Sequence, residues 1–244
     1  LDPIATGLLP LCFGESTKLS GLFLGADKTY WTRIRLGEKT ATGDCEGDVI
    51  ERKLVTVNQS ALEVALSKFR GRIQQTPPMY SAVKVNGQPL YKLAREGIEI
   101  ERQPRTVSVY ELELKSFDGQ DLELELKCSH GFYVRGLAQD LGDQLGCGGH
   151  VTSLRRLVVA DLHVGDSVSL DDLENAPGGA GREKMLISID QGLSHLPQID
   201  LSMDAAFYLC RGQAVRASRL PKEGPVRLYA QEAGFLGIGM VTDD

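Results

Sequence analysis

The sequence has no long hydrophobic run and no paired cysteine motif, and these absences exclude several classes of protein. No apolar stretch approaches the roughly 20 residues that span a bilayer, and no signal peptide is visible, so we expect no membrane association. The cysteines are odd in number and form no Cys-x-x-Cys pair, which argues against a disulfide framework and against a zinc site. A reducing, cytoplasmic location is therefore expected. The cysteines are Cys12, Cys45, Cys128, Cys147 and Cys210.

Histidine is equally sparse, and its spacing does not match a metal site. The histidines are His130, His150, His163 and His195. Because none of them has a partner at ligand spacing, we interpret them as ordinary surface or core residues and expect no bound metal.

The composition is that of an ordinary soluble globular protein. Its 244 residues are 42% hydrophobic and 25% charged, enough for one large domain or for a large domain with a small one. The net charge of -6 argues against a protein that coats nucleic acid without specificity. Positive charge still gathers locally, and RNA binding would need several such clusters on one face. The clusters are Arg33, Arg35 and Lys39; Lys68, Arg70 and Arg72; Arg95, Arg102 and Arg105; and Arg155 with Arg156.

The first half of the chain alternates between strand and helix patterns. Residues 28–36 alternate with a period of two, which predicts a half-buried strand whose inner face carries Tyr30 and whose outer face is basic. Residues 37–47 are polar and glycine-bearing and are expected to form a loop. An amphipathic helix is predicted after Ser60, with Leu62, Ala65, Leu66 and Phe69 at helical spacing.

A long excursion follows at residues 76–105, rich in proline, glycine and charge, with a short helix expected near 90–95. Excursions of this length in compact domains are usually functional or disordered. We call this segment the thumb-like excursion.

The middle of the chain predicts a hairpin followed by a helix. Residues 107–117 and 122–128 read as strands around the tight-turn pair Asp118-Gly119. A helix with an apolar stripe starts near Val134, so Tyr133 and Arg135 lie where a strand becomes a helix. Side chains at such a junction often line a cleft.

The last third predicts a further strand-rich stretch at 151–164 and then a small β unit. The glycines of residues 177–181 give the best linker pattern in the chain. Beyond residue 196, short apolar strands are expected at 214–215, 226–229 and 235–241.

A carboxylate stands beside a proline at the start of the chain, in the segment Leu1-Asp2-Pro3-Ile4-Ala5-Thr6-Gly7-Leu8-Leu9-Pro10. The residues alone leave two interpretations of Asp2 open. It is a nucleophile, base or anchor at the edge of an apolar site, or it is a plain N-cap before a proline. The chain begins without Met and ends after a strand-like run, so we expect further residues at both ends of the natural protein.

Five separate segments, in the right order, match one known family. They are residues 1–10; residues 28–30 with 35–37 and 44–47; residues 77–84 with 90–91 and 94–97; residues 128–135; and residues 148–156. Together they resemble the TruB family of tRNA pseudouridine synthases, and the tail from about residue 196 is similar to a PUA RNA-binding domain. The family's segment before the catalytic Asp, which carries a His-Gly pair, is missing, and the tail is expected to be cut short.

The resemblance implies a fold and a domain division. The fold is α+β, with a mixed, mainly antiparallel sheet and flanking helices, plus a small β-barrel-like PUA domain. A catalytic domain is expected at 1–192, including the thumb-like excursion, and a PUA-like domain at 196–244.

The resemblance also implies a reaction, which is isomerisation of uridine to pseudouridine at U55 in the T loop of tRNA. The base is flipped out, and no metal or redox cofactor is needed. The expected partner is the tRNA T stem-loop, and the protein is expected to be a monomer. Asp2 is implied as the nucleophile, Arg135 as its ion-pair partner and Tyr30 as the residue that stacks on the uracil and moves a proton. Substrate contacts are implied for Tyr133, Leu154, Lys84 and Arg95.

Three alternatives compete with this interpretation. An RNA-binding module without chemistry would not need the pair Asp2 and Arg135, and both are present. The guide-RNA-dependent branch of the same superfamily lacks a long thumb, which the 76–105 excursion supplies here. An unrelated hydrolase using Asp2 would need a second acid or a nucleophile elbow, and neither is visible.

Overall fold

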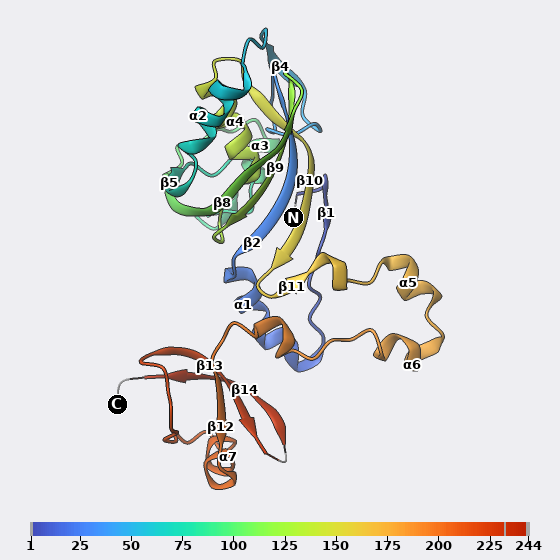
Figure 1. The fold of residues 1–244 in the computed structure, drawn as a ribbon, viewed down its shortest axis with the longest axis vertical. Helices are drawn as coiled ribbons and strands as arrows, with labels where there is room; N and C mark the ends of the chain where they lie inside the picture. The colour runs from blue at the N-terminus through green and yellow to red at the C-terminus, as the bar shows by residue number, and fades with distance from the viewer. Residues whose placement is uncertain (1, 232, 243–244) are drawn as a thin grey trace. The chain divides into compact units, whose positions relative to one another are not determined.

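The computed structural model describes residues 2–231 and 233–242, and the chain divides into two compact units (Figure 1). The first unit is Leu1–Val159 with His163–Ser167, and the second is Ala160–Leu162 with Val168–Asp244. Because residues 168–195 pack with the second unit, the compact units do not coincide with the domain limits expected from the sequence, 1–192 and 196–244, and those limits stay a prediction.

The first unit is built on a large, twisted sheet. The strands of the first unit are β1 (Ala5–Gly7), β2 (Lys28–Leu36), β3 (Glu38–Thr40), β4 (Val49–Arg52), β5 (Gly71–Gln75), β6 (Lys84–Val85), β7 (Gln88–Pro89), β8 (Arg105–Phe117), β9 (Asp121–Cys128) and β10 (Gly149–Val159). The pairs β3-β4 and β6-β7 form small sheets of their own. The helices of this unit are η1 (Gly14–Leu19), α1 (Ser20–Gly25), α2 (Gln59–Ser67), α3 (Leu90–Arg95), α4 (Val134–Gln144) and η2 (Val164–Asp166). The two-residue strand β11 (Leu162–His163) lies where the units meet in sequence.

The strand order of this sheet is β1-β10-β2-β9-β8-β5. β1 pairs with β10 in parallel, and the other neighbours along this path are antiparallel. The expected mixed, mainly antiparallel α+β fold is therefore confirmed. The Asp118-Gly119 turn between β8 and β9 is also confirmed: the Asp118 carboxylate accepts the backbone N–H groups of Gln120 and Asp121, and Gly119 adopts φ 103°, which suits a residue without Cβ.

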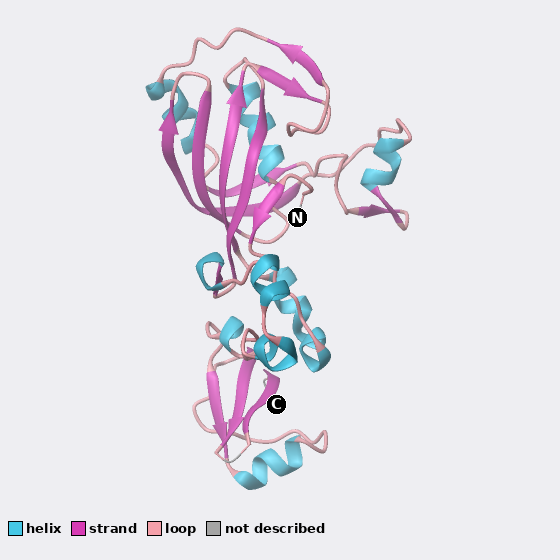
Figure 2. Cartoon of the chain, turned by 90° about the vertical axis from the view of Figure 1, so that its right-hand side faces the viewer, coloured by secondary structure: helices cyan, strands magenta, loops and turns pink. Residues whose placement is uncertain are grey.

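One face of the sheet is covered by α2 and α4 (Figure 2). The predicted alternation of β2 holds, since Thr32, Ile34 and Leu36 are buried. Ile34 pairs with Leu122 of β9 and with Val151 of β10, so it lies at the centre of the sheet. Burying each such aliphatic side chain contributes about 1.5–3 kcal/mol. The helices add their apolar stripes, which are Leu62, Ala65 and Leu66 from α2, and Leu137, Ala138 and Leu141 from α4.

Two local expectations in the first unit need correction. The helix expected after Ser60 begins earlier, at Gln59, because the Asn58 side chain accepts the Ala61 N–H at 2.9 Å and caps it. The expected loop at 37–47 contains β3, which pairs with β4. The short helix expected near 90–95 is present as α3.

The second unit contains a small sheet of order β12-β13-β14. Its strands are β12 (Gln198–Leu201), β13 (Gly224–Ala230) and β14 (Gly234–Val241), and its helices are α5 (Leu170–Asn175), α6 (Gly178–Glu183), η3 (Gln191–Leu193) and α7 (Met203–Leu209). The core is made by Ile199, Leu201, Ala206, Val226 and Leu228 together with Ala230. The expected small C-terminal sheet unit is thus confirmed, whereas its closure into a PUA-like barrel stays a prediction.

Two predictions for the second unit are wrong. Residues 214–215 form no strand, and β12 supplies the third strand instead. The expected linker at 177–181 mostly belongs to α6, because Pro177 acts as its N-cap and its carbonyl accepts the Gly181 N–H at 3.2 Å. Within residues 2–231 and 233–242, no helix combines the length and apolarity that crossing a membrane requires.

Candidate active site

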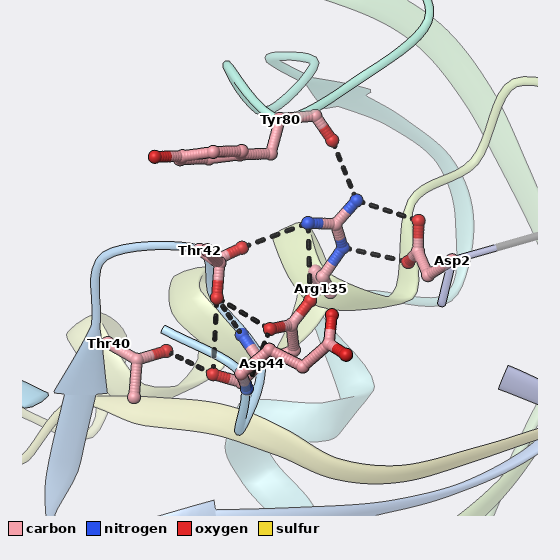
Figure 3. A network of polar contacts seen from close by, with 7 residues as sticks. Asp2, Thr40, Thr42, Asp44, Tyr80 and Arg135 are labelled. Carbon is pink, nitrogen blue, oxygen red and sulfur yellow. Dashed lines mark hydrogen bonds and ion pairs between the residues drawn. The ribbon is translucent and has the colours of Figure 1, made fainter. Parts of the chain in front are cut away.

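An ion pair between Arg135 and Asp2 forms the centre of the candidate site (Figure 3). Arg135 Nε donates to Asp2 Oδ2 and Arg135 Nη2 donates to Asp2 Oδ1, each at 2.7 Å. Both carboxylate oxygens are thus held by one planar guanidinium, the geometry that Arg provides and Lys does not. The Arg135 side chain is 5% exposed and the Asp2 side chain is 26% exposed. The carboxylate therefore remains accessible to a ligand while its partner is buried.

Arg135 is held by further acceptors on three sides. Its Nη1 donates to the Thr42 carbonyl at 3.1 Å, and its Nη2 also donates to the Tyr80 carbonyl at 2.7 Å. The Asp44 carboxylate lies 3.3 Å from Nη1. A buried guanidinium needs such partners, because an unpaired charge in a protein interior costs several kcal/mol. These contacts leave the Arg135 side chain one orientation, which points at Asp2.

Asp44 is a functional candidate that the sequence did not predict. It is buried, its Oδ1 accepts the Thr42 hydroxyl at 2.5 Å and the Glu46 N–H at 3.1 Å, and its carbonyl accepts the Thr40 hydroxyl at 2.7 Å. The motif at 44–47 contributes to the family resemblance without assigning a role to its acid. The sequence feature that could have pointed to Asp44 is a carboxylate with Thr42 and glycines beside it in a polar loop, because such a loop can wrap around the acid.

Tyr30 lies on the inner face of β2, as its strand pattern predicted, and is partly buried against the core. Burial raises the pKa of Tyr30 above its usual range; the charge of Arg156 opposes this rise, and that of Asp2 adds to it. The hydroxyl is therefore neutral near pH 7. This environment favours stacking and hydrogen bonding, and it works against an ionised tyrosinate base.

The remaining predicted residues fall into two groups. Tyr133 is the N-cap of α4, two residues before Arg135, and Leu154 is a buried residue of β10 that pairs with Ala5 and Thr32. Both lie beside elements that carry the site, since α4 carries Arg135 and β10 pairs with β2, which carries Tyr30. Lys84 in β6 and Arg95 in α3 are exposed on the thumb-like excursion, and neither takes part in the described Arg135 network. Arg95 stacks over the Tyr91 ring at 5.5 Å.

The described part of the chain holds no cluster of three or more His, Cys, Asp or Glu side chains suited to a metal ion. The groups around Asp2 are the Arg135 guanidinium, which donates to it, and the backbone carbonyls of Thr42 and Tyr80, which accept from that guanidinium. This arrangement is suited to nucleophilic chemistry by an oriented carboxylate.

Comparison with known protein families shows the family of this chain. The family model described as TruB family pseudouridylate synthase, N-terminal domain, matches residues 1–134. The chain belongs to the TruB family. Two further TruB models, for the tRNA pseudouridylate synthase B C-terminal domain and the pseudouridine synthase II C-terminal region, match residues 135–193 and 197–244. The resemblance drawn from the five motifs is therefore confirmed.

Relatives in the TruB family match over the whole chain. One is tRNA pseudouridine synthase B of Stutzerimonas stutzeri, 49% identical, with 100% of this chain and 81% of the relative covered. Another is tRNA pseudouridine synthase B of Coxiella burnetii, 50% identical, with 100% of this chain and 80% of the relative covered. Among solved structures, a Cbf5-Nop10-Gar1 complex contains a chain that matches with a TM-score of 0.74 at 22% identity, covering 98% of this chain and 67% of that one. This last likeness concerns the fold.

Proposed function

We propose that this TruB-family chain isomerises uridine to pseudouridine at U55 in the T loop of tRNA. The observation that carries the proposal is the bidentate contact of Arg135 with Asp2, because it lies within the family's catalytic motif and presents an oriented, partly exposed carboxylate. The relatives named tRNA pseudouridine synthase B, which match over the full chain, support tRNA as the substrate.

Asp2 acts as the nucleophile. The reaction detaches uracil from its ribose, turns the base and rejoins it through carbon 5, so the atoms rearrange within one nucleotide and no cofactor takes part. An oxygen that accepts one hydrogen bond from Arg135 keeps a second lone pair for attack. Attack at ribose C1′ and attack at uracil C6 would use the same carboxylate. Either requires the uridine to leave the stack and reach Asp2.

The other site residues shape and hold the substrate. Arg135 keeps the Asp2 carboxylate aimed, and the neutral Tyr30 stacks on the flipped uracil and supplies a hydroxyl for proton transfer. Tyr133 and Leu154 form walls of the uracil pocket. Lys84 and Arg95 contact phosphates of the T stem, since exposed cations on the thumb-like excursion suit the RNA backbone.

The tRNA T stem-loop is the proposed partner, recognised by its shape and its splayed loop. The C-terminal unit adds a PUA-like contact to the same RNA, and the enzyme works as a monomer. We propose a cytoplasmic location, which the five free thiols support because a reducing compartment keeps cysteines unpaired.

The decisive experiment is to incubate the protein with an unmodified tRNA transcript and to map pseudouridine at nucleotide resolution. Asp2→Asn keeps the shape of the side chain and removes the nucleophile, so isomerisation should be abolished while tRNA affinity stays nearly unchanged. Asp48→Asn, a change of a carboxylate in the loop after Asp44, is the matched control and should act like wild type. A rate within about tenfold of wild type for Asp2→Asn would contradict the nucleophile assignment.

A further inference from the structure

The Gln75 side chain clamps the backbone of a residue far away in sequence. Gln75 Nε2 donates to the Tyr133 carbonyl at 2.9 Å, and Gln75 Oε1 accepts the Tyr133 N–H at 2.8 Å. The amide thus satisfies both backbone groups of one residue, which a side chain with only a donor or only an acceptor cannot do. Gln75 is 3% exposed, so solvent does not replace these contacts.

The clamped residue is the point where α4 begins. Tyr133 is the N-cap of α4, and its own side chain makes no capping hydrogen bond. Its carbonyl already accepts the Leu137 N–H at 3.1 Å, so Gln75 adds a second donor to the same oxygen. Arg135 follows two residues later, in the first turn of the helix. A shift of the Tyr133 backbone would therefore move the guanidinium that holds Asp2.

The first turn of α4 leaves room for the Gln75 side chain because residue 136 is a glycine. A Cβ placed on Gly136 would lie 2.8 Å from Gln75 Nε2 and 3.2 Å from its Cδ. Real Cβ atoms do not approach other heavy atoms this closely, so the glycine at 136 leaves the space that the amide fills. The amide is thus fixed both by its hydrogen bonds and by the first turn of α4.

Gln75 also stands at the root of the thumb-like excursion. It is the last residue of β5, and the carbonyl of Tyr80, five residues further on, accepts from Arg135 Nη2 at 2.7 Å. The root of the excursion therefore contacts the start of α4 at two points, once on the backbone and once on the catalytic guanidinium.

We propose that Gln75 is a positioning residue for the isomerisation, which sets the Tyr133 backbone so that Arg135 reaches both oxygens of Asp2. This inference rests on the proposed function of Arg135 and Asp2. Gln75 itself touches no substrate. It acts through α4, and a small error in its contacts is expected to reduce the chemical rate while tRNA affinity is unchanged.

Gln75→Glu tests this proposal, because it changes one hydrogen-bonding group and keeps the size of the side chain. An ionised carboxylate still accepts the Tyr133 N–H and repels the Tyr133 carbonyl. We expect the single-turnover rate at pH 8 to fall by about tenfold or more, with tRNA affinity within about threefold of wild type. A protonated carboxyl group can donate to that carbonyl as the amide did. The difference in single-turnover rate between Gln75→Glu and wild type should therefore shrink as the pH falls from about 8 to 5.5.

The wild-type pH profile is measured in parallel. Arg135 on α4 and Arg105, which pairs with Gln75 across β5 and β8, are charged groups common to both proteins. Asp2 and Asp44, which bind Arg135, are also common to both proteins, so the ratio of the two rates reports the change at residue 75.

Two further variants test whether the effect comes from the Gln75 contacts or only from an added negative charge. Gln74→Glu changes the exposed neighbour, whose amide contacts Thr106, and should match wild type at every pH. Gly136→Ala presses on the Gln75 amide from the helix side and should lower the rate in the same way, without the pH-dependent recovery. If Gln75→Glu does not fold, as judged by circular dichroism and thermal melting, the single-turnover rate of Gly136→Ala tests the proposal instead.

The combination of Gln75→Glu with Arg135→Lys separates this inference from the proposed function. If Gln75 acts through Arg135, the double variant should be about as slow as Arg135→Lys alone. A folded Gln75→Glu protein at the wild-type rate, or one that loses affinity in step with rate, overturns the positioning role. A wild-type rate for Arg135→Lys alone would instead overturn the proposed function of the ion pair.

Discussion

Arg135 donates parallel hydrogen bonds of 2.7 Å to both carboxylate oxygens of Asp2, although 133 residues separate the two in sequence. The guanidinium is buried and is itself held by Asp44 and by the carbonyls of Thr42 and Tyr80. The carboxylate thus has a defined direction before any RNA binds. Such preorganisation lowers the barrier to attack, because no reorientation remains to be made in the transition state.

Arg135→Lys should separate charge from geometry. Lysine keeps the positive charge and loses the planar fork that grips both oxygens. We expect the single-turnover rate to fall by about a hundredfold, with tRNA affinity changed less than about threefold. Arg70→Lys is the matched control, since Arg70 also uses two nitrogens, on the Leu112 carbonyl, and plays no part in the Asp2 network. A loss of affinity at an unchanged rate would identify Arg135 as a phosphate contact.

Asp44→Asn should remove the second negative charge beside Arg135 while keeping the turn around it. The Asn side-chain oxygen can still accept the Thr42 hydroxyl and the Glu46 N–H. We expect the rate to fall by about tenfold at unchanged tRNA affinity, and the free energy of unfolding to fall by about 1–3 kcal/mol. Single-turnover assays and urea titration measure the two effects. A normal rate would show that Asp2 and the carbonyls alone orient Arg135.

Tyr30 should act as a neutral hydroxyl and aromatic ring. Because burial raises its pKa, the ionised form is scarce at pH 7 to 9. A tyrosinate base would make the rate rise about tenfold per pH unit up to that pKa. We expect no such rise in the single-turnover profile between about pH 7 and 9. Tyr30→Phe keeps the stacking ring and should slow the reaction more than it weakens binding. A rate that climbs steadily with pH would show that the anion is the active form.

The thumb-like excursion should act on binding more than on chemistry. Lys84, Lys92 and Arg95 are exposed on it, and replacing all three by Ala removes cations that release counterions from RNA. We expect weaker tRNA binding and a flatter dependence of affinity on salt, with little change in single-turnover rate at saturating tRNA. Beyond its anchored root, the excursion should also be more protected from hydrogen exchange when tRNA is bound. Equal salt slopes for wild type and the triple variant would show that these side chains face solvent.

The sequence by itself determined the local elements and the family. The period of two in residues 28–36, the Asp118-Gly119 turn and the helical stripe after Val134 each depend on neighbouring residues, and the structure shows β2, the β8–β9 hairpin and α4 there. The five motifs also predicted the TruB family, because their order and spacing are read directly along the chain.

The tertiary structure alone decided the geometry of the site and the contacts of Asp44 and Gln75. The pairing of Asp2 with Arg135 followed from the resemblance, and its two-point geometry came from the fold. The places of Asp44 beside Arg135 and of Gln75 against Tyr133 were not predicted. The periods of two and 3.6 residues state which face of an element is buried, and they carry no information on which distant element covers it. The buried polar contacts that orient the site join residues that only the strand order and the packing of α4 bring together.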